Sequence, residues 1–253
     1  MNMKPFVLTT LGSLTLLTTS GVAMAEDVVL QPHGAASNDV SLYQGFPASN
    51  LNGAAFGGAF EGLLSATKTA GTGLPGHEIQ SLLSFELPTD GQAVQGAQLR
   101  VYNLPDFVPF PIGAANATRP VDVSAYALSG AGFDDETATW AVSPYTRDAG
   151  LNPSNLGAAV DTVTVNATGA WFTLDVTAAV QAALANAQTT AGFALVSNTA
   201  DWNGQNAAGL IAASGSYANA AFHPQLVLDV VPEPATASML LAAGGLALLR
   251  RRR

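Results

Sequence analysis

The chain of 253 residues contains no cysteine, which excludes disulfides, thiolate metal sites and cysteine nucleophiles. All eighteen acidic residues lie between Glu26 and Glu233, and the same stretch holds only four basic residues: Lys68, Arg100, Arg119 and Arg147. Eighteen against four leaves this part of the chain at about −14, which disfavours nucleic acid and anionic membranes as partners and favours solubility and divalent cations.

Residues 1–25 predict a secretory signal peptide. Lys4 supplies the basic region, an apolar stretch runs from Phe6 to Leu17, and Ala23-Met24-Ala25 fits the small-residue pattern of a cleavage site. An uncleaved N-terminal anchor is the alternative, and the short, threonine-rich apolar stretch argues against it. We therefore expect export and cleavage after Ala25.

Residues 26–231 predict one all-β domain, which at about two hundred residues is long enough to bury a substantial core. Several short runs alternate apolar and polar residues with period two, as in strands that are covered on one face. In each run the residues expected to face the core are Ile79, Leu83, Phe85 and Leu87; Ala97, Leu99 and Val101; Val121, Val123 and Ala125; Phe172, Leu174 and Val176; and Leu226, Leu228 and Val230.

Weaker strands are expected at residues 28–30, 60–64, 160–165, 193–197 and 209–213. Only one helix is convincing: Thr177 can cap residues 178–187, with Val180, Leu184 and Ala187 as a narrow apolar stripe. Many short strands with one short helix favour a single β-sandwich of jelly-roll type. The turn-rich segments Gln31–Phe56 and Pro105–Pro120 are then expected to be surface loops.

The body also resembles the DNRLRE-type β-sandwich domain. Its IQSLLSFELPTDGQAVQGAQLRVY segment (79–102) resembles the paired strands that open that domain, FDDETATW (133–140) resembles its W-x-E-x-x-V-T-W segment, and WFTLDVTAAVQAAL (171–184) its strand-then-helix segment. The resemblance implies a β-sandwich framework in which Trp140 and Trp171 are packing residues. Some members of this family are alginate-binding modules attached to lyases, and many others stand alone with a sorting tail and no established ligand. The resemblance therefore implies binding of an extracellular polysaccharide, with an alginate-like polymer as one candidate.

Calcium is the one cofactor for which the sequence offers candidate ligands, as a structural ion. Calcium needs six to eight oxygen ligands, and no EF-hand loop is present. The densest acidic group is Asp134-Asp135-Glu136, which Asp39 and Asp106 can join from other expected loops. The alternative is a solvated acidic turn in which Asp135 anchors a loop by hydrogen bonds.

The candidate glycan-binding residues lie in the run Asp201–Asn206, which combines an aromatic ring with amides: Trp202, Asn203, Gln205 and Asn206. Tyr43 and Phe46 are weaker candidates. The alternative for Trp202 is a structural role, folded back over a sheet edge. Because the body is acidic, an alginate-like ligand would need calcium or one of the four basic residues at its site, whereas a neutral glycan would stack on Trp202.

An enzyme is the least favoured function class. Gly71–Gly76 fits G-x-G-x-x-G, but Pro75 opposes the helix that a dinucleotide site needs after the motif. The three histidines, His33, His77 and His223, show no metal-ligand spacing, and no G-x-S-x-G nucleophile motif is present. We therefore expect no catalytic residues.

The C-terminal residues 232–253 predict a membrane anchor. Pro232-Glu233-Pro234 precedes fifteen uncharged residues, 235–249, and the chain then ends in four arginines, Arg250, Arg251, Arg252 and Arg253. A helix over fifteen residues would span about 22 Å, slightly less than the ~30 Å hydrocarbon core. Arginines flanking an apolar segment stay in the cytoplasm, so the Pro-Glu-Pro end should lie outside. A terminal core helix is the alternative.

This tail resembles a PEP-CTERM sorting signal, which combines a Pro-Glu-Pro motif, a transmembrane helix and a terminal arginine cluster. The resemblance implies that an exosortase processes the chain in a Gram-negative bacterium that makes extracellular polysaccharide. It also implies transient anchoring in the membrane, followed by release to the cell surface or a biofilm matrix. The sequence thus favours an exported polysaccharide-binding protein, with a purely structural matrix protein as the alternative and a polysaccharide-processing enzyme as a third class.

Overall fold

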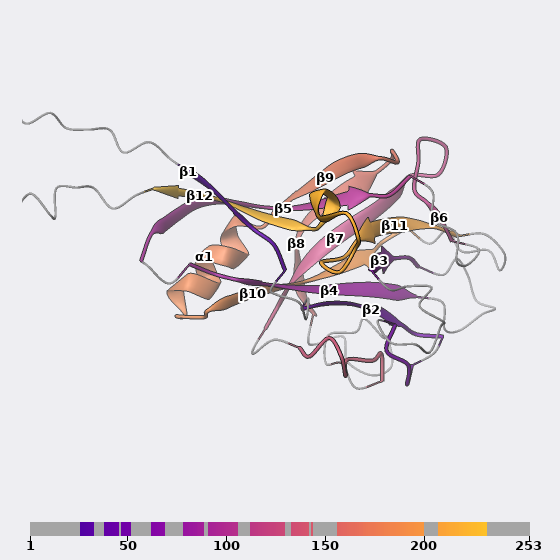
Figure 1. Cartoon of the computed structure of the whole chain (residues 1–253), viewed down its shortest axis with the longest axis horizontal. Helices are drawn as coiled ribbons and strands as arrows, with labels where there is room; N and C mark the ends of the chain where they lie inside the picture. Colours follow the sequence, from indigo (N-terminus) through magenta and orange to yellow (C-terminus); the bar gives the residue numbers. More distant parts are fainter. Residues whose placement is uncertain are drawn as a thin grey trace, which may run out of the picture.

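The structure, a computed structural model, describes residues 26–32, 38–45, 47–51, 62–68, 78–88, 91–105, 112–129, 133–141, 143, 156–199 and 207–231. Among these residues, twelve strands form two sheets, accompanied by one α-helix and a short 3₁₀ helix at Ala220–Phe222 (Figure 1). The predicted β-sandwich is confirmed. None of the helices in these ranges is long and apolar enough to cross a membrane.

The first sheet has seven strands among the described residues. Five follow one another in the order β1 (Glu26–Leu30), β12 (Gln225–Val231), β5 (Ala93–Asn103), β11 (Ala207–Ala213) and β3 (Leu63–Ala66). In addition, β9 (Ala170–Asp175) pairs antiparallel with β5, and β6 (Ile112–Ala114) pairs parallel with β11. The long strand β5 is therefore the centre of this sheet.

The second sheet has five antiparallel strands among the described residues. Their order is β2 (Asp39–Tyr43), β4 (Ile79–Glu86), β10 (Thr190–Ser197), β7 (Val121–Leu128) and β8 (Leu156–Val165). A pair of backbone hydrogen bonds between Thr67 and Ile79 joins the two sheets at one corner. Ser65 strengthens this corner, since its backbone N–H lies 3.0 Å from the Ser41 hydroxyl and 2.8 Å from the Ser81 hydroxyl.

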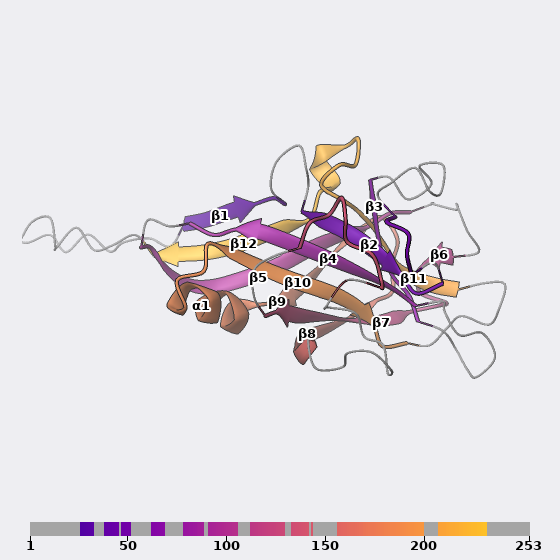
Figure 2. The ribbon, with the colours of Figure 1, turned by 90° about the horizontal axis from the view of Figure 1, so that it is seen from below.

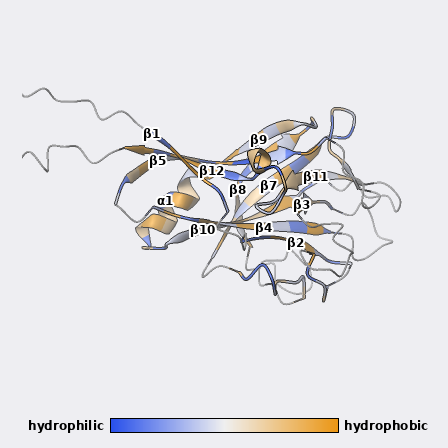
Figure 3. Ribbon diagram, in the orientation of Figure 1, coloured by the Kyte–Doolittle hydropathy of each residue, from blue (hydrophilic) through white to orange (hydrophobic). Residues whose placement is uncertain are grey.

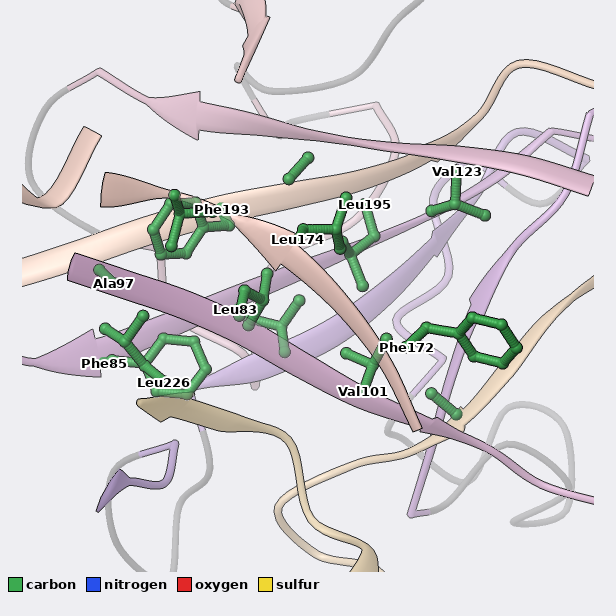
Figure 4. Packing of buried hydrophobic residues seen from close by; sticks show 14 of the residues in the cluster. Leu83, Phe85, Ala97, Val101, Val123, Phe172, Leu174, Phe193, Leu195 and Leu226 are labelled. Carbon is green, nitrogen blue, oxygen red and sulfur yellow. The ribbon is translucent and has the colours of Figure 1, made fainter. Parts of the chain in front are cut away.

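The main hydrophobic core lies between the two sheets. Leu83, Phe85, Val123, Phe193 and Leu195 point into it from the second sheet, and the first sheet supplies Ala97, Val101, Phe172, Leu174 and Leu226 (Figure 4). These are the residues that the period-two alternation assigns to the buried face, apart from Phe193 and Leu195, which lie in a strand predicted without a face. The alternating orange and blue along the strands in Figure 3 is the same pattern seen in three dimensions.

A second hydrophobic cluster covers the outer face of the five-stranded sheet, which the sequence analysis did not predict. It joins Val40, Leu42, Leu82, Ala194 and Val196 of the strands to Trp140 and Ala138 of the turn segment 133–141. Every residue of β4 except Glu86 is consequently buried, including Gln80 and Ser84, which the alternation placed on a polar outer face. That expectation was wrong because a loop, invisible to strand periodicity, packs over the sheet.

The two segments expected to be surface loops are also partly incorporated in the fold. The segment Gln31–Phe56 contains β2, in which all five residues are buried, and the fully buried Leu51. The segment Pro105–Pro120 contains β6 and the fully buried Ala115. Turn-forming residues in both segments surround a short strand that is held by its neighbours rather than by its own sequence pattern.

The helix α1 (Thr177–Ala185) is shorter than predicted. Thr177 does not cap it, because its hydroxyl bonds to Asp175 and lies 2.9 Å from the backbone nitrogen of Ala97. The helix ends early because Ala187 adopts a left-handed φ of 54°, and the Gln188 N–H bonds to the Ala183 carbonyl, as in a Schellman motif. The buried residues of the helix are Val180 and Ala183, whereas Ala187 is exposed.

The first and last strands lie side by side. Strand β1 pairs antiparallel with β12, so that Glu26 stands opposite Val230. Figures 1 and 2 show both strands at the same end of the sandwich, beside α1. The beginning and the end of the body are therefore neighbours in space.

Candidate functional site

The outer face of the first sheet carries a row of polar and aromatic side chains along β5. Its buried residues Leu99 and Val101 face the core, so that Gln98, Arg100 and Tyr102 point to the opposite side. The pairing of β12 with β5 shifts by one residue between Asp229 and Val230, which gives β5 a bulge near Gly96. Bulges re-aim side chains and are common beside binding sites.

Strand register extends this row into a two-dimensional array. On one side of β5, Trp171 of β9 pairs with Tyr102, Thr173 with Arg100 and Asp175 with Gln98. On the other side, Gln225, Val227 and Asp229 of β12 pair with Arg100, Gln98 and Gly96. We call this surface the outer track; it comprises Gly96, Gln98, Arg100, Tyr102, Trp171, Thr173, Asp175, Gln225, Val227 and Asp229.

One end of the outer track is aromatic. The Tyr102 ring stacks on Phe222 with centroids 4.2 Å apart and meets Trp171 edge to face at 5.4 Å. The Arg100 guanidinium carbon lies 5.0 Å from the Trp171 ring centroid, in cation–π geometry. All four side chains are only partly buried, so this end offers both ring surface and a cation to solvent.

The other end of the outer track is an acidic groove. It has a volume of about 590 Å³ and is open to solvent. Four aspartates line it, together with polar and small residues of β5, β9 and β12: Asp27, Asp161, Asp175 and Asp229 with Gly96, Gln98 and Thr173. No lysine, arginine or histidine is among its described lining residues.

The four aspartates are held differently. Asp161 accepts hydrogen bonds from the backbone N–H of Thr162 and of Asp175, which ties β8 to β9. Asp175 accepts from the Thr177 hydroxyl and backbone N–H, and these bonds lower the pKa of its carboxyl, because they stabilise the charged form.

The remaining two aspartates stand opposite each other on β1 and β12. Asp27 is exposed and pairs in register with Asp229. The Oδ1 atom of Asp229 exposes less than 1 Å² and has no hydrogen-bond partner among the residues that the structure describes. Buried acceptors without a donor are unusual in folded proteins.

The glycan-binding residues predicted from sequence, Trp202, Asn203, Gln205 and Asn206, lie outside the described residues. The same holds for Phe46 and for the processing residues of both ends: Ala23, Ala25, Pro232, Glu233, Pro234, Arg250, Arg251, Arg252 and Arg253. Tyr43 is 2% exposed in β2 and offers no surface for a ligand. Trp140 is buried, as expected of a packing residue, whereas Trp171 is partly exposed at the aromatic end of the outer track.

The structure describes four of the five predicted calcium ligands. Asp39 begins β2, is fully buried, and accepts a hydrogen bond from the Gly215 N–H, so its placement in a loop was wrong. Asp134, Asp135 and Glu136 share one turn, and Asp106 lies outside the described residues. Among the residues that the structure describes, no three His, Asp or Glu side chains are arranged to hold a metal ion.

Asp135 belongs to the packing of the turn rather than to an open site. Burial raises the pKa of its carboxyl, and the charges of Asp134 and Glu136 act in the same direction. The Asn50 side chain donates to the carbonyl oxygens of Asp135 at 2.7 Å and Ala138 at 2.8 Å, which fixes the turn against the segment 47–51. A loop anchor was the alternative that the sequence analysis left open for this residue.

Sequence reasoning did not find the outer track, although it assigned most of its residues correctly to the solvent-facing side of strands. The missing information is the register, which places Trp171, Thr173 and Asp175 beside Tyr102, Arg100 and Gln98. Polar residues on separate strands carry no signal of their neighbours in a single sequence. The sequence did offer one indication: Trp171 stands on the polar face of its strand.

Two family models together match most of the chain. Residues 58–229 match the model of carbohydrate-binding module family 96, and residues 230–253 match the PEP-CTERM protein-sorting motif. No curated protein matches the chain. The family match confirms the resemblances drawn from the sequence and contains every residue of the outer track. Because it covers more than half of the chain, the protein belongs to carbohydrate-binding module family 96, and it carries a PEP-CTERM motif of the kind found on exported, exosortase-processed proteins.

Proposed function

We propose that this protein binds a polysaccharide chain along the outer track. The observation that carries the proposal is a solvent-accessible sheet face, with a partly exposed tryptophan at one end and a polar groove at the other, in a chain of a carbohydrate-binding family. From Gly96 to Tyr102 the track spans six residue steps of β5, or about 20 Å. That length suits several sugar units of an extended glycan.

The two ends of the outer track offer complementary interactions. The Trp171 ring supplies an apolar face for the C–H side of a sugar, a contact worth about 0.5–1.5 kcal/mol beyond area burial. Gln98 both donates and accepts hydrogen bonds, and the carboxylates accept them from hydroxyl groups. A ligand of this kind is held by the sheet framework and requires no closing loop.

A glycan array on a recombinant body of residues 26–231 tests binding, and variants test the site. Trp171→Ala should weaken retention severalfold. Adding Gln98→Ala to that variant should weaken retention further. Glu86→Gln, on the exposed end of β4 in the other sheet, is the matched control and should bind as the parent does. Retention of a glycan that neither track variant affects would move the site elsewhere, with Trp202 and its neighbours as the next candidates.

We further propose that both ends of the chain are processed. Cleavage after Ala25 and within or near Pro232–Pro234 would leave the described body, bounded by β1 and β12. Intact mass of the secreted species checks this, and Glu233→Ala should leave unprocessed chain in the membrane fraction. Extracellular protein that still carries Arg250–Arg253 would contradict exosortase processing.

The envelope or the extracellular matrix is the proposed destination. A polysaccharide-binding module released from the membrane by exosortase would remain where its ligand is abundant, on the cell surface or in a biofilm. If the array retains no glycan while processing proceeds normally, a structural role in the matrix replaces binding as the function.

A further inference from the structure

A buried asparagine lies beneath the aromatic end of the outer track. Asn103 is the last residue of β5 and follows Tyr102, so its side chain points to the core side of the strand, where it is fully buried. Leu99 and Val101 occupy the same side as apolar residues. The core side of β5 therefore ends in an amide, and a buried amide is costly unless it has hydrogen-bond partners.

The Asn103 side chain joins three segments that are far apart in the sequence. Its amide nitrogen donates to the carbonyl oxygen of Ala115, between β6 and β7, at 2.9 Å, and to that of Ala167, between β8 and β9, at 2.8 Å. Its amide oxygen accepts from the backbone N–H of Ile211 in β11 at 3.1 Å. The side chain thus uses both of its donors and its acceptor in one buried junction.

One of these segments carries the tryptophan of the outer track. The turn between β8 and β9 reaches β5 at Gly169, whose N–H donates to the Asn103 carbonyl oxygen at 2.7 Å. Gly169 has a left-handed φ of 64°, and the Tyr102 hydroxyl lies 3.6 Å from the place where a Cβ atom would be. Ala170 then pairs with Asn103, and Trp171 with Tyr102. Asn103 therefore holds this turn through its side chain and its backbone, immediately before the tryptophan.

The junction matters for binding as well as for stability. A buried amide with partners for all its groups favours one arrangement of the segments it joins. An apolar residue at position 103 would leave two carbonyls and one N–H without that partner. The turn would then loosen, and the Trp171 ring would take several positions beside Tyr102. A sugar that stacks on a loose ring must first order it, and this ordering opposes binding.

Resting on the proposed polysaccharide function, we infer that Asn103 is a positioning residue of the outer track. It does not touch the glycan. It sets where the Trp171 ring stands relative to Tyr102 and Arg100, and it thereby presents an ordered stacking surface to a sugar. The role is carried by the hydrogen bonds of one buried side chain, so single substitutions can test it.

Fluorine NMR measures the state of the ring without any ligand. The full chain, labelled with fluorotryptophan and held in detergent, gives one resonance for each of its three tryptophans, which single Trp→Phe substitutions assign. Asn103→Ala should shift or broaden the Trp171 resonance and leave that of Trp140, which packs on the other sheet, unchanged. Gly169→Ala strains the same turn at its left-handed position and should also move the Trp171 resonance, which keeps the test available if Asn103→Ala does not fold.

Calorimetry on the full chain in detergent measures the effect on binding, with a mannuronate hexasaccharide and with cellohexaose as a neutral probe. For either of these, or for any glycan of the array that the parent binds, Asn103→Ala should bind about fivefold more weakly, because ordering a loose ring opposes binding. In a Trp171→Ala background the same substitution should cause no further loss, since the ring through which Asn103 acts is absent.

Asn50→Ala is the matched control. The Asn50 side chain also donates to two backbone carbonyls, those of Asp135 and Ala138, but it does so at the segment that packs on the five-stranded sheet. Its loss should lower stability comparably and change neither the Trp171 resonance nor the affinity. Denaturation midpoints of all variants compare their stabilities.

The outcomes separate this inference from the proposed function. A Trp171 resonance that is unchanged in both Asn103→Ala and Gly169→Ala would overturn the positioning role. An equal loss of affinity in Asn50→Ala, or a full further loss in the Trp171→Ala background, would overturn it as well. If Asn103→Ala displaces the Trp171 resonance while the parent binds neither hexasaccharide nor any glycan of the array, the positioning of the ring is supported and polysaccharide binding is overturned.

Discussion

The two sheets use their outer faces in opposite ways. The outer face of the five-stranded sheet is covered by the turn segment 133–141, whose Trp140 joins Leu82 and Ala194 in one hydrophobic cluster. Among the described residues, the outer face of β12, β5 and β9 is solvent-accessible and carries charged and aromatic side chains that alternate with buried ones. The covered face carries apolar residues such as Leu82, Ala194 and Val196, so the apolar or polar character of a strand's second face decides whether a loop packs on it or a ligand can meet it.

Truncating the tryptophan of the covering segment 133–141 is expected to have the largest effect on stability. Trp140→Ala would leave a cavity against Leu82 and Ala194 and should lower the free energy of unfolding by about 3–5 kcal/mol. Chemical denaturation measures the loss. Glycan affinity of the remaining folded protein should be unchanged, because the outer track lies on the other sheet. A loss below about 1 kcal/mol would mean that the segment 133–141 contributes little to stability.

Weakening the attachment of the segment 133–141 should lower the free energy of unfolding by less. Asn50→Ala deletes the two side-chain hydrogen bonds to the carbonyls of Asp135 and Ala138 and should lower stability by about 2 kcal/mol. Denaturation midpoints measure this effect. Asn50→Asp is an informative companion, since a carboxylate cannot donate to those carbonyls and should be at least as damaging. Wild-type stability in both variants would show that the segment 47–51 is not the anchor.

On the open face, a comparable aromatic truncation should affect stability less than Trp140→Ala does, and glycan binding more. Trp171→Ala removes one ring pair and one cation–π contact, together about 1–2 kcal/mol, from a partly exposed position. Thermal unfolding should therefore shift less than in Trp140→Ala, while glycan affinity falls severalfold. A larger stability loss in Trp171→Ala than in Trp140→Ala would contradict the assignment of Trp140 to packing and of Trp171 to binding.

The smallest expected effects are changes in how stability depends on pH. The raised pKa of Asp135 means that its folded form prefers the proton, so its contribution to stability declines as pH rises above about 4, where the unfolded carboxyl ionises. Asp135→Asn should therefore be more stable relative to the parent at pH 7 than at pH 3. The lowered pKa of Asp175 has the opposite sign: its contribution is present at neutral pH and lost as pH falls through its folded value.

Asp175→Asn should accordingly lose stability at pH 7 and approach the parent at low pH. Denaturation of both variants across this pH range compares a covered carboxyl with an open one. Parallel curves for the two substitutions would show that burial and hydrogen bonding do not distinguish the two environments.

The sequence predicted those features that depend on local alternation. Leu99, Val101, Phe172 and Leu174 face the core as period two requires, and the resemblances of the body and of the tail are both confirmed by the family matches. It did not predict that β4 is buried on both faces, because the covering residues lie some fifty residues further along the chain. Such coverage depends on tertiary packing, which overrides strand propensity.

The site was less accessible to prediction than the fold. Trp171 was assigned to packing from the family resemblance, and Trp202 to binding from its neighbours in an expected loop. The outer track instead arises from the register across β12, β5 and β9. Asp39 shows the same limit for metals: its neighbour Asn38 suggests a turn, but the strand pairing of β2 buries it. Cross-strand neighbours could have been found only with the pairing known.

The pairing of β1 with β12 has a consequence for how such a module travels between proteins. Since Glu26 stands opposite Val230, the body begins and ends within about 5 Å, the spacing of adjacent strands. A domain with neighbouring ends can be inserted into a host chain at one surface position without separating the host's own elements, and it tolerates circular permutation. A short linker from Val231 to Glu26, with new ends opened at a surface loop, should yield a permuted body that keeps its outer track.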